Sequence, residues 1–208
     1  MERTIEMTFK ILALIVFISS TGLMAVLYLV PQFLEKPSHI VLKQKGRFEL
    51  RQYEDILLSS VKVSGDQYSA LRSGFKPLSD YIFAREREGD KISMTAPVMQ
   101  SSGETENEWV VSFSMPSKYH KVSLPDPSND RVYAEEMKQI TAAVLRFSGH
   151  ADQRLLDSKT ELLSDWIEAT GYRIISKPKY LFYNPPRTPG FLKRNEVMLI
   201  VDNERVGD

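Results

Sequence analysis

The sequence predicts one α+β domain, built from two copies of a strand, helix, strand, strand unit and preceded by one transmembrane helix. Three observations predict this arrangement. Residues 11–30 are predominantly apolar and carry no formal charge. Two later segments of the chain match each other in order and residue type. Each of them combines alternating apolar residues, typical of a strand, with apolar residues at helical spacing.

Residues 11–30 have the length and composition of a membrane-spanning helix. At about 1.5 Å per residue the stretch would cross about 30 Å of hydrocarbon. It lacks the polar face that a globular helix presents to water. A cleavable signal peptide would have an apolar core of only about 7–15 residues and a small-residue cleavage site. We therefore expect a retained anchor at 11–30, after a tail at 1–10.

Basic residues lie on both flanks of this stretch, with Arg3 and Lys10 before it and Lys36 beyond it. The positive-inside rule therefore leaves the side of the membrane open. Beyond the anchor we assign residues 31–46 to a linker and 47–208 to a single domain, because a chain of this length suits one core.

Composition excludes several classes of function. The chain has 27 basic and 27 acidic residues, and this balance argues against a nucleic-acid partner. It contains no cysteine, so it can form neither a disulfide nor a cysteine metal site.

The internal repeat consists of two pairs of matching segments. VKVSG at 61–65 leads to LSDYI at 78–82, and VLRFSG at 144–149 leads to LSDWI at 163–167. Each copy begins with an alternating apolar segment, reaches a Ser-Gly turn and enters an amphipathic helix. Pro77 lies inside the first helix and is expected to kink or disrupt it.

Strand patterns follow each predicted helix, at 91–95, 109–115, 172–176, 180–183 and 197–201. The last run is apolar at every position, so we expect it to be covered on one face by the other half and on the opposite face by a helix or a ligand pocket. With a further strand at 48–53, the two units would pair into a mostly antiparallel sheet curved toward a barrel, with the helices outside. Arg194 and Glu196 lie two residues apart and are expected to form a surface ion pair.

Six short motifs together resemble the SOUL haem-binding protein family. They are FELRQY at 48–53, KISMTAPV at 91–98, FSMP at 113–116, FSG at 147–149, YNPP at 183–186 and RNEV at 194–197. The resemblance covers residues 48–201. It implies a pseudo-symmetric domain with a distorted antiparallel eight-stranded barrel, flanked by two long helices. It also implies that the protein binds haem or another tetrapyrrole.

The resemblance further implies that the tetrapyrrole lies against the first long helix. That helix would supply an apolar wall and an arginine for the propionates. The segment at 91–98 either borders the pocket or ends a strand at its proline. The tyrosine of YNPP either binds a propionate or belongs to a turn. The candidate cofactor-binding residues are Leu71, Arg72, Phe75, Leu78, Met94 and Tyr183. Apolar residues at this spacing also form ordinary protein core, so both interpretations stay open.

The sequence departs from part of the family at the iron ligand. Gln52 stands where some members carry a histidine that is taken as the ligand, and glutamine is not an ordinary haem ligand. Three histidines and two methionines are the other donors considered: His39, His120, His150, Met94 and Met99. We therefore predict reversible haem binding with the axial ligand unassigned, and no metal site built by the protein itself.

The chain contains no nucleophile elbow, phosphate loop or clustered metal-ligand spacing, so we predict a protein without catalytic residues. The predicted function is membrane-anchored tetrapyrrole binding for storage, delivery or buffering. Duplicated units of this kind also look like the gyrase-inhibitor-like ligand binders, some of which are hydrolases. A carboxylate and a tyrosine converging in a central groove would favour that alternative. A membrane-tethered interaction domain without a small ligand is the third hypothesis.

Overall fold

A computed structural model of the protein describes residue 22 and residues 31–205, with side chains described as far as residue 202. Apart from Gly22, the predicted anchor at 11–30 lies outside the described residues, as does the tail at 1–10. None of the helices in the described part of the chain combines the length and the apolar character needed to span a membrane.

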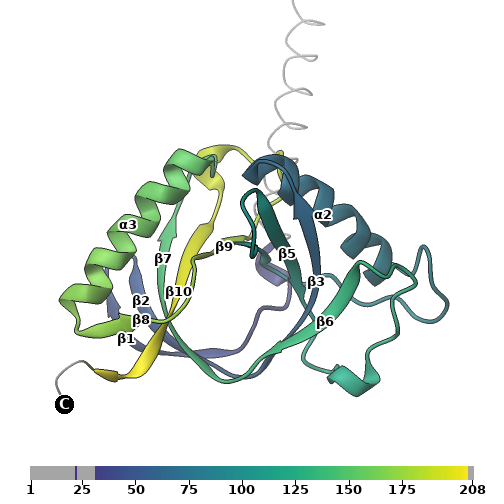
Figure 1. Ribbon diagram of the computed structural model, residues 1–208, viewed down its shortest axis with the longest axis horizontal. Coiled ribbons are helices and arrows are strands. Elements are labelled where there is room, and N and C mark those ends of the chain that lie inside the picture. The colour runs from purple at the N-terminus through teal and green to yellow at the C-terminus, as the bar shows by residue number, and fades with distance from the viewer. Residues whose placement is uncertain (1–21, 23–30, 206–208) are drawn as a thin grey trace, which may run out of the picture.

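The described chain folds into one antiparallel sheet and two long helices (Figure 1). The elements are, in order, β1 (His39–Lys45), β2 (Phe48–Tyr53), β3 (Ile56–Ser64), α2 (Gln67–Ile82), β4 (Val98–Ser102), β5 (Glu108–Ser114), η1 (Lys121–Ser123), β6 (Val132–Met137), β7 (Ile140–Phe147), α3 (Gln153–Ala169), β8 (Tyr172–Ile174), β9 (Lys179–Phe182), η2 (Gly190–Leu192) and β10 (Asn195–Arg205).

The predicted duplication is present in the strand order. The units β3-α2-β4-β5 and β7-α3-β9-β10 have the same sequence of elements. Their strands form a path β2-β7-β10-β9-β4-β5-β3-β6 that is symmetric about the β9/β4 pair. This path contains the eight strands that the family resemblance implies. Both long helices lie outside the curled sheet, α3 along its left wall and α2 along its right wall in Figure 1.

The expected distorted eight-stranded barrel is corrected in two respects. The sheet has ten strands, because β1 pairs with β2 at one edge and β8 pairs with β10. Within the described residues, β1 and β6 are the two ends of the strand path and do not pair with each other, so the sheet is a curled half-barrel. β1 arises from residues 39–45, which the sequence assigned to a linker, because they pair with β2 along its whole length.

Two local expectations are also wrong. Residues 91–95 form no strand, and the strand starts later, at Val98. Ile92 is bound instead to the end of α2, where its amide donates to the Ile82 carbonyl at 2.7 Å. Pro77 does not interrupt α2, which runs continuously from Gln67 to Ile82. Packing of the helix on the sheet outweighs the hydrogen bond that proline removes.

The apolar run at 197–201 is covered on both faces, as the sequence predicts. Val197, Leu199 and Val201 pack in one cluster with Leu156, Leu163 and Ile167 of α3. Met198 points to the opposite, concave face of the sheet. There it belongs to a cluster with residues of both halves, among them Ile56 and Leu58 from β3 and Leu181 from β9.

α2 packs unusually close to the sheet at Gly74. A Cβ atom on this residue would lie 2.7 Å from the Cβ and one Cγ of Val111 on β5, a separation that atoms in contact do not reach without a shift. Ala70 and Leu78 flank Gly74 on the buried side, each with no exposed surface. At Ala70 and Gly74 the face of α2 that meets the sheet is therefore lined by small residues, whereas Tyr68 and Phe75 are partly exposed to solvent.

We predict that Gly74→Ala destabilises the protein by about 1–3 kcal/mol because the added methyl overpacks the contact with Val111. The sign of the change in the free energy of unfolding is informative, because alanine at an unconstrained helix position would stabilise the protein by about 1 kcal/mol relative to glycine. Urea unfolding measures the difference. Ser73→Ala, at the exposed neighbouring position, is the control and should change the free energy of unfolding by less than about 0.5 kcal/mol. A neutral or stabilising Gly74→Ala would contradict the close approach.

Candidate functional site

The predicted site residues on α2 divide between the core and the surface. Leu78 is fully buried in the cluster between α2 and the sheet, and Leu71 and Met94 pack partly buried against that cluster. Phe75 is 40 % exposed, with its ring 5.2 Å from the Phe113 ring in an edge-on contact. Leu78 is therefore a core residue, whereas Phe75 remains accessible to a ligand.

Tyr68 extends the accessible part of this helix, and the list of candidate residues missed it. Its side chain is 56 % exposed, and the guanidinium carbon of Arg72 lies 5.9 Å from the centre of its ring. Tyr68, Leu71, Arg72 and Phe75 together are called the α2 flank below. The sequence offered a signal for Tyr68, because it lies seven residues before Phe75, and residues two helical turns apart lie on the same face of a helix.

Arg72 is the cation available on the α2 flank. Among the described residues it has no carboxylate partner, and its side chain is exposed. Lys76, the next basic residue along α2, donates to Asp80 at 2.6 Å, and Arg85 binds the other oxygen of the same carboxylate at 2.9 Å. Asp80 therefore occupies Lys76 and leaves Arg72 free to meet an anionic group.

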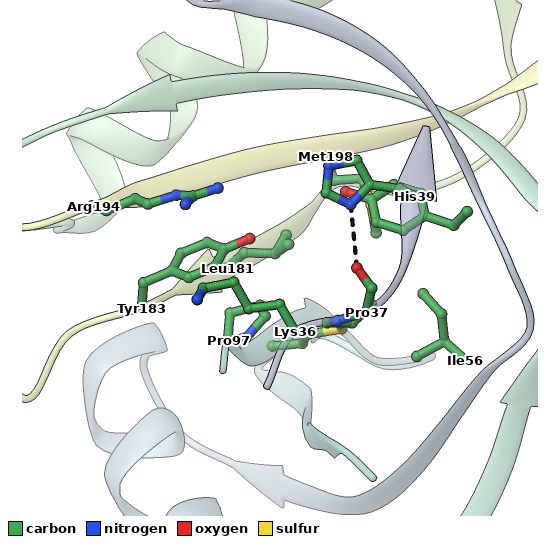
Figure 2. Close-up of a pocket in the computed structure, with 11 residues that line it drawn as sticks. Lys36, Pro37, His39, Ile56, Pro97, Leu181, Tyr183, Arg194 and Met198 are labelled. Atoms are coloured by element: carbon green, nitrogen blue, oxygen red, sulfur yellow. Dashed lines mark hydrogen bonds between the residues drawn. The ribbon is translucent and has the colours of Figure 1, made fainter. Parts of the chain in front are cut away.

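Tyr183 does not join the α2 flank, because it lies on the concave face of the sheet. There it lines a pocket whose wall is largely apolar (Figure 2). Its cavity is small, about 20 Å³, which is roughly the room that one water molecule needs. The lining residues come from both halves and from the segment before β1: Lys36, Pro37, His39, Tyr53, Ile56, Pro97, Met99, Leu181, Tyr183, Arg194 and Met198. We call it the concave pocket.

A buried carboxylate, Glu196, lies beside the concave pocket. Its side chain has no exposed surface and accepts hydrogen bonds from Arg51 at 2.9 and 3.2 Å, from Arg194 at 2.6 and 3.0 Å and from the Tyr183 hydroxyl at 2.9 Å. Arg51 is only 2 % exposed and also donates to the Tyr53 hydroxyl at 3.0 Å. The predicted surface pair of Arg194 and Glu196 therefore exists, but it belongs to a buried network.

The network sets the charge states of its members. Burial alone would raise the pKa of Glu196, but the hydrogen bonds and charges of Arg51 and Arg194 outweigh it and hold the pKa below its ordinary value. Burial, followed by the negative charge of Glu196, raises the pKa of the Tyr183 hydroxyl well above its ordinary value. Glu196 is thus a carboxylate with every oxygen engaged, and Tyr183 stays protonated.

Within the described part of the chain the three histidines lie apart from one another. His39 lines the concave pocket, with its Nδ1 3.2 Å from the Pro37 carbonyl and its ring 4.9 Å from the Tyr53 ring. His120 caps the short helix η1, and His150 packs beside Gly190. Across residues 31–202 no three histidine or carboxylate side chains gather in a way that could hold a metal ion.

Comparison with known proteins relates the chain to a family of binding proteins. A family model described as SOUL heme-binding protein matches residues 34–200. The chain is 30 % identical over 168 residues to Heme-binding protein 2 of Homo sapiens, covering 77 % of this chain and 81 % of that protein. It is 27 % identical over 162 residues to Heme-binding protein 1 of Xenopus tropicalis, covering 75 % of this chain and 84 % of that protein.

Solved structures share the fold at low sequence identity. The C-terminal domain of EcmrR aligns with a TM-score of 0.57 and 15 % identity, over 76 % of this chain and 98 % of that one. A hydrolase from Listeria innocua aligns with a TM-score of 0.52 and 13 % identity, over 80 % of this chain and 92 % of that one. At this identity the likeness establishes a common fold and nothing about activity.

We predict that Glu196→Gln destabilises the protein by about 3–5 kcal/mol, because it removes the buried carboxylate shared by Arg51 and Arg194 and leaves Glu49 as the one carboxylate bound to Arg51 among the described residues. Equilibrium unfolding in urea at neutral pH measures this loss. Glu104→Gln is the matched control: Glu104 pairs with Lys62 at 2.8 Å on the surface, so its loss should cost less than about 1 kcal/mol. Equal effects of the two substitutions would contradict the buried network.

The pH dependence of this difference has a definite sign. Because the folded-state pKa of Glu196 lies below its ordinary value of 4.5, the stabilisation is complete above that pH and is lost as the pH falls through the folded-state pKa. The gap in unfolding free energy between the original protein and Glu196→Gln should therefore narrow in acid below pH 4.5.

Proposed function

Because the chain belongs to the SOUL heme-binding protein family, we propose that it binds haem or another tetrapyrrole reversibly, at the α2 flank. A tetrapyrrole is a broad apolar disc with carboxylates at its rim, so its site needs an apolar wall beside a cation. The relatives that carry the name heme-binding protein support a ligand of this class.

The exposed rings of the α2 flank are the observation that carries the proposal. Tyr68 and Phe75 are 56 % and 40 % exposed on one side of a helix whose opposite side is fully packed. Aromatic surface of this kind gains free energy when a flat apolar ligand covers it. Arg72 lies next to Tyr68 and has no carboxylate partner among the described residues, so it is suited to a propionate.

The residues present fit a tetrapyrrole held without an iron ligand from the protein. Gln52 is exposed on β2, in the strand that some relatives are taken to use for their histidine. His39 lies in the concave pocket, which is lined by packed side chains and has little room for a porphyrin. Binding through ring contacts and propionates is weaker than binding with an axial bond, which suits reversible uptake and release.

We propose binding without catalysis, for storage, delivery or buffering of the ligand. The hydrolase alternative called for a carboxylate and a tyrosine converging in a central groove, and Glu196 and Tyr183 do converge beside the concave pocket. Glu196, however, has its oxygens occupied by two arginines and a tyrosine, so it has no free lone pair with which to activate water. This geometry favours a structural counter-ion.

The proposal includes a membrane anchor at residues 11–30. The support is the uncharged apolar composition of that stretch and its length, which matches a bilayer. An anchor would hold the domain near the bilayer, into which apolar tetrapyrroles partition. The side of the membrane is left open by this proposal.

We predict that the full chain binds haem with a dissociation constant in the micromolar range, about 8 kcal/mol. Titration monitored by the Soret band measures it. Arg72→Glu should weaken binding about tenfold or more, because it replaces the propionate partner with a like charge. Arg154→Glu makes the same charge change on the exposed side of α3 and is the control.

Three outcomes of the titration separate the alternatives. Weaker binding by Arg72→Glu alone supports the α2 flank. Equal affinity in both variants would remove this surface from the site. The absence of any saturable change, together with no fluorescence quenching by metal-free porphyrin, would reject the tetrapyrrole and favour an interaction domain without a small ligand.

A further prediction concerns the anchor. Deletion of residues 11–30 should move the protein from the membrane fraction to the soluble fraction, because it removes the apolar stretch that would span the bilayer. Alkaline carbonate extraction of the full chain and the deletion variant measures the distribution. A full chain released by carbonate would contradict the anchor.

A further inference from the structure

The loop that joins β9 to β10 presents an exposed phenylalanine on a fixed backbone. Residues 184–193, called the rim loop, contain η2, in which Phe191 is 76 % exposed. The Lys193 amide donates to the Gly190 carbonyl at 3.1 Å, and the Gly149 amide donates to the same oxygen at 2.9 Å. The exposure of Phe191 therefore belongs to an ordered loop that is tied to the end of β7.

The segment before β1 lies against the base of the rim loop. Residues 31–38, called the strap, contribute Lys36 and Pro37 to the lining of the concave pocket, where they meet Tyr183 and Arg194 from the two ends of the rim loop. Figure 2 shows Lys36 beside the Tyr183 ring, over which the Arg194 guanidinium carbon lies 4.1 Å from the ring centre. Because the cavity between them has room for about one water molecule, these side chains lie close together.

The strap carries a second exposed phenylalanine. Phe33 is 85 % exposed, whereas Leu34 packs against the concave core. Glu35 fixes the strap in place, because its carbonyl accepts from the Ala96 amide at 2.9 Å and its carboxylate accepts from the Ser117 amide at 2.6 Å. Among the described side chains, Phe33 and Phe191 are the two most exposed aromatic residues, and they extend from two segments that meet at one rim of the sheet.

The charges at this rim are positive. The rim loop contains Arg187 and Lys193 and has no aspartate or glutamate. Arg187 is exposed, and no carboxylate of the described chain pairs with it. Glu35 is the acidic residue of the strap, and its carboxylate is bound to a backbone amide. The rim therefore combines exposed aromatic rings with cations that have no carboxylate partner, a combination that favours an apolar surface with negative charge.

The position of the rim along the chain indicates what that surface is. The apolar stretch at 11–30 ends immediately before the strap. A chain extends by at most about 3.6 Å per residue, so Phe33 lies within about 11 Å of the end of that stretch. This step rests on the membrane anchor proposed above: if residues 11–30 span a bilayer, the strap begins at its surface and the rim loop lies beside it.

We propose that the strap and the rim loop dock the domain onto the surface of an anionic bilayer. Phe33 and Phe191 insert among the lipid headgroups, and Arg187 and Lys193 lie against acidic lipids. The rings gain free energy by leaving water, and the cations gain it from the negative surface potential. The contact is a second attachment beside the anchor, and it holds the domain in one orientation on the membrane.

A second copy of the chain fits the same surface less well. Two aromatic side chains bury at most about 500 Å². A stable protein interface buries about 800 Å² on each partner. A bilayer has no such requirement, because binding there grows with each inserted ring and each basic residue.

The test measures the depth of a fluorescent label in the full chain. The chain has no cysteine, so Phe191→Cys accepts a single nitrobenzoxadiazole label. Leu162→Cys is the matched control, because Leu162 is 45 % exposed on α3. In vesicles of phosphatidylcholine and phosphatidylserine, lipids with a nitroxide near the headgroup should quench the label at position 191. They should not quench the label at position 162.

The contribution of charge is tested in the labelled Phe191→Cys chain. Arg187→Glu should lower the ratio of docked to undocked domains about fivefold or more in vesicles that contain phosphatidylserine, because a basic residue loses its attraction to the surface. In phosphatidylcholine alone the substitution should have little effect. Arg131→Glu, at an exposed position before β6, is the control and should leave the quenched fraction unchanged.

Three results would overturn the proposal. The first is equal quenching at positions 191 and 162, or no quenching at either. The second is an emission shift at position 191 that increases with protein concentration and occurs without quenching by lipid, because it would show a second copy on this surface. The third is an unchanged quenched fraction in Arg187→Glu.

Carbonate extraction distinguishes the failure of this proposal from the failure of the anchor. A chain that carbonate retains, without quenching at position 191, would leave the anchor standing and reject the docking surface. A chain that carbonate releases, with quenching at position 191, would reject the anchor and support the docking surface. No haem is present in these measurements, so the tetrapyrrole titration is judged separately.

Discussion

The antiparallel pairing of β4 with β9 is the contact on which the arrangement of the whole domain depends. It runs from Val98 opposite Phe182 to Ser101 opposite Lys179 and joins two similar halves into one sheet. Because the halves are related about this pair, the sheet curls and both helices lie on its outer side. The inner side is then shared by both halves, which is why residues far apart in sequence line a common pocket.

The two faces of this sheet have different chemistry. Outside, the helices bury apolar residues and α2 leaves aromatic rings exposed, because Gly74 lets the helix approach Val111 so closely. Inside, apolar side chains surround a charged network centred on Glu196. The network is costly to desolvate, and it is retained because each charge has a partner. A flat apolar ligand suits the outer face, whereas the inner face is filled by packed side chains.

The sequence and the structure disagree where local pattern does not reveal the tertiary neighbour. Helical spacing placed Phe75 and Leu78 on one stripe, yet Leu78 is buried and Phe75 is exposed, because the small residues Ala70 and Gly74 face the sheet. Arg194 and Glu196 were expected on the surface. Their pairing follows from alternation on a strand, whereas their burial comes from Arg51, more than a hundred residues earlier.

The sequence by itself determined the repeated unit, the two amphipathic helices, the burial of the run at 197–201 on both faces and the resemblance to the SOUL family. These features depend on periodicity and order, which are local properties of a chain. Only the tertiary structure decided that the sheet stays open at its edges, which α2 residues remain accessible, and that Arg51, Arg194 and Tyr183 meet at the buried Glu196. Such contacts depend on which distant strands pair and how closely a helix packs, and no local pattern encodes either.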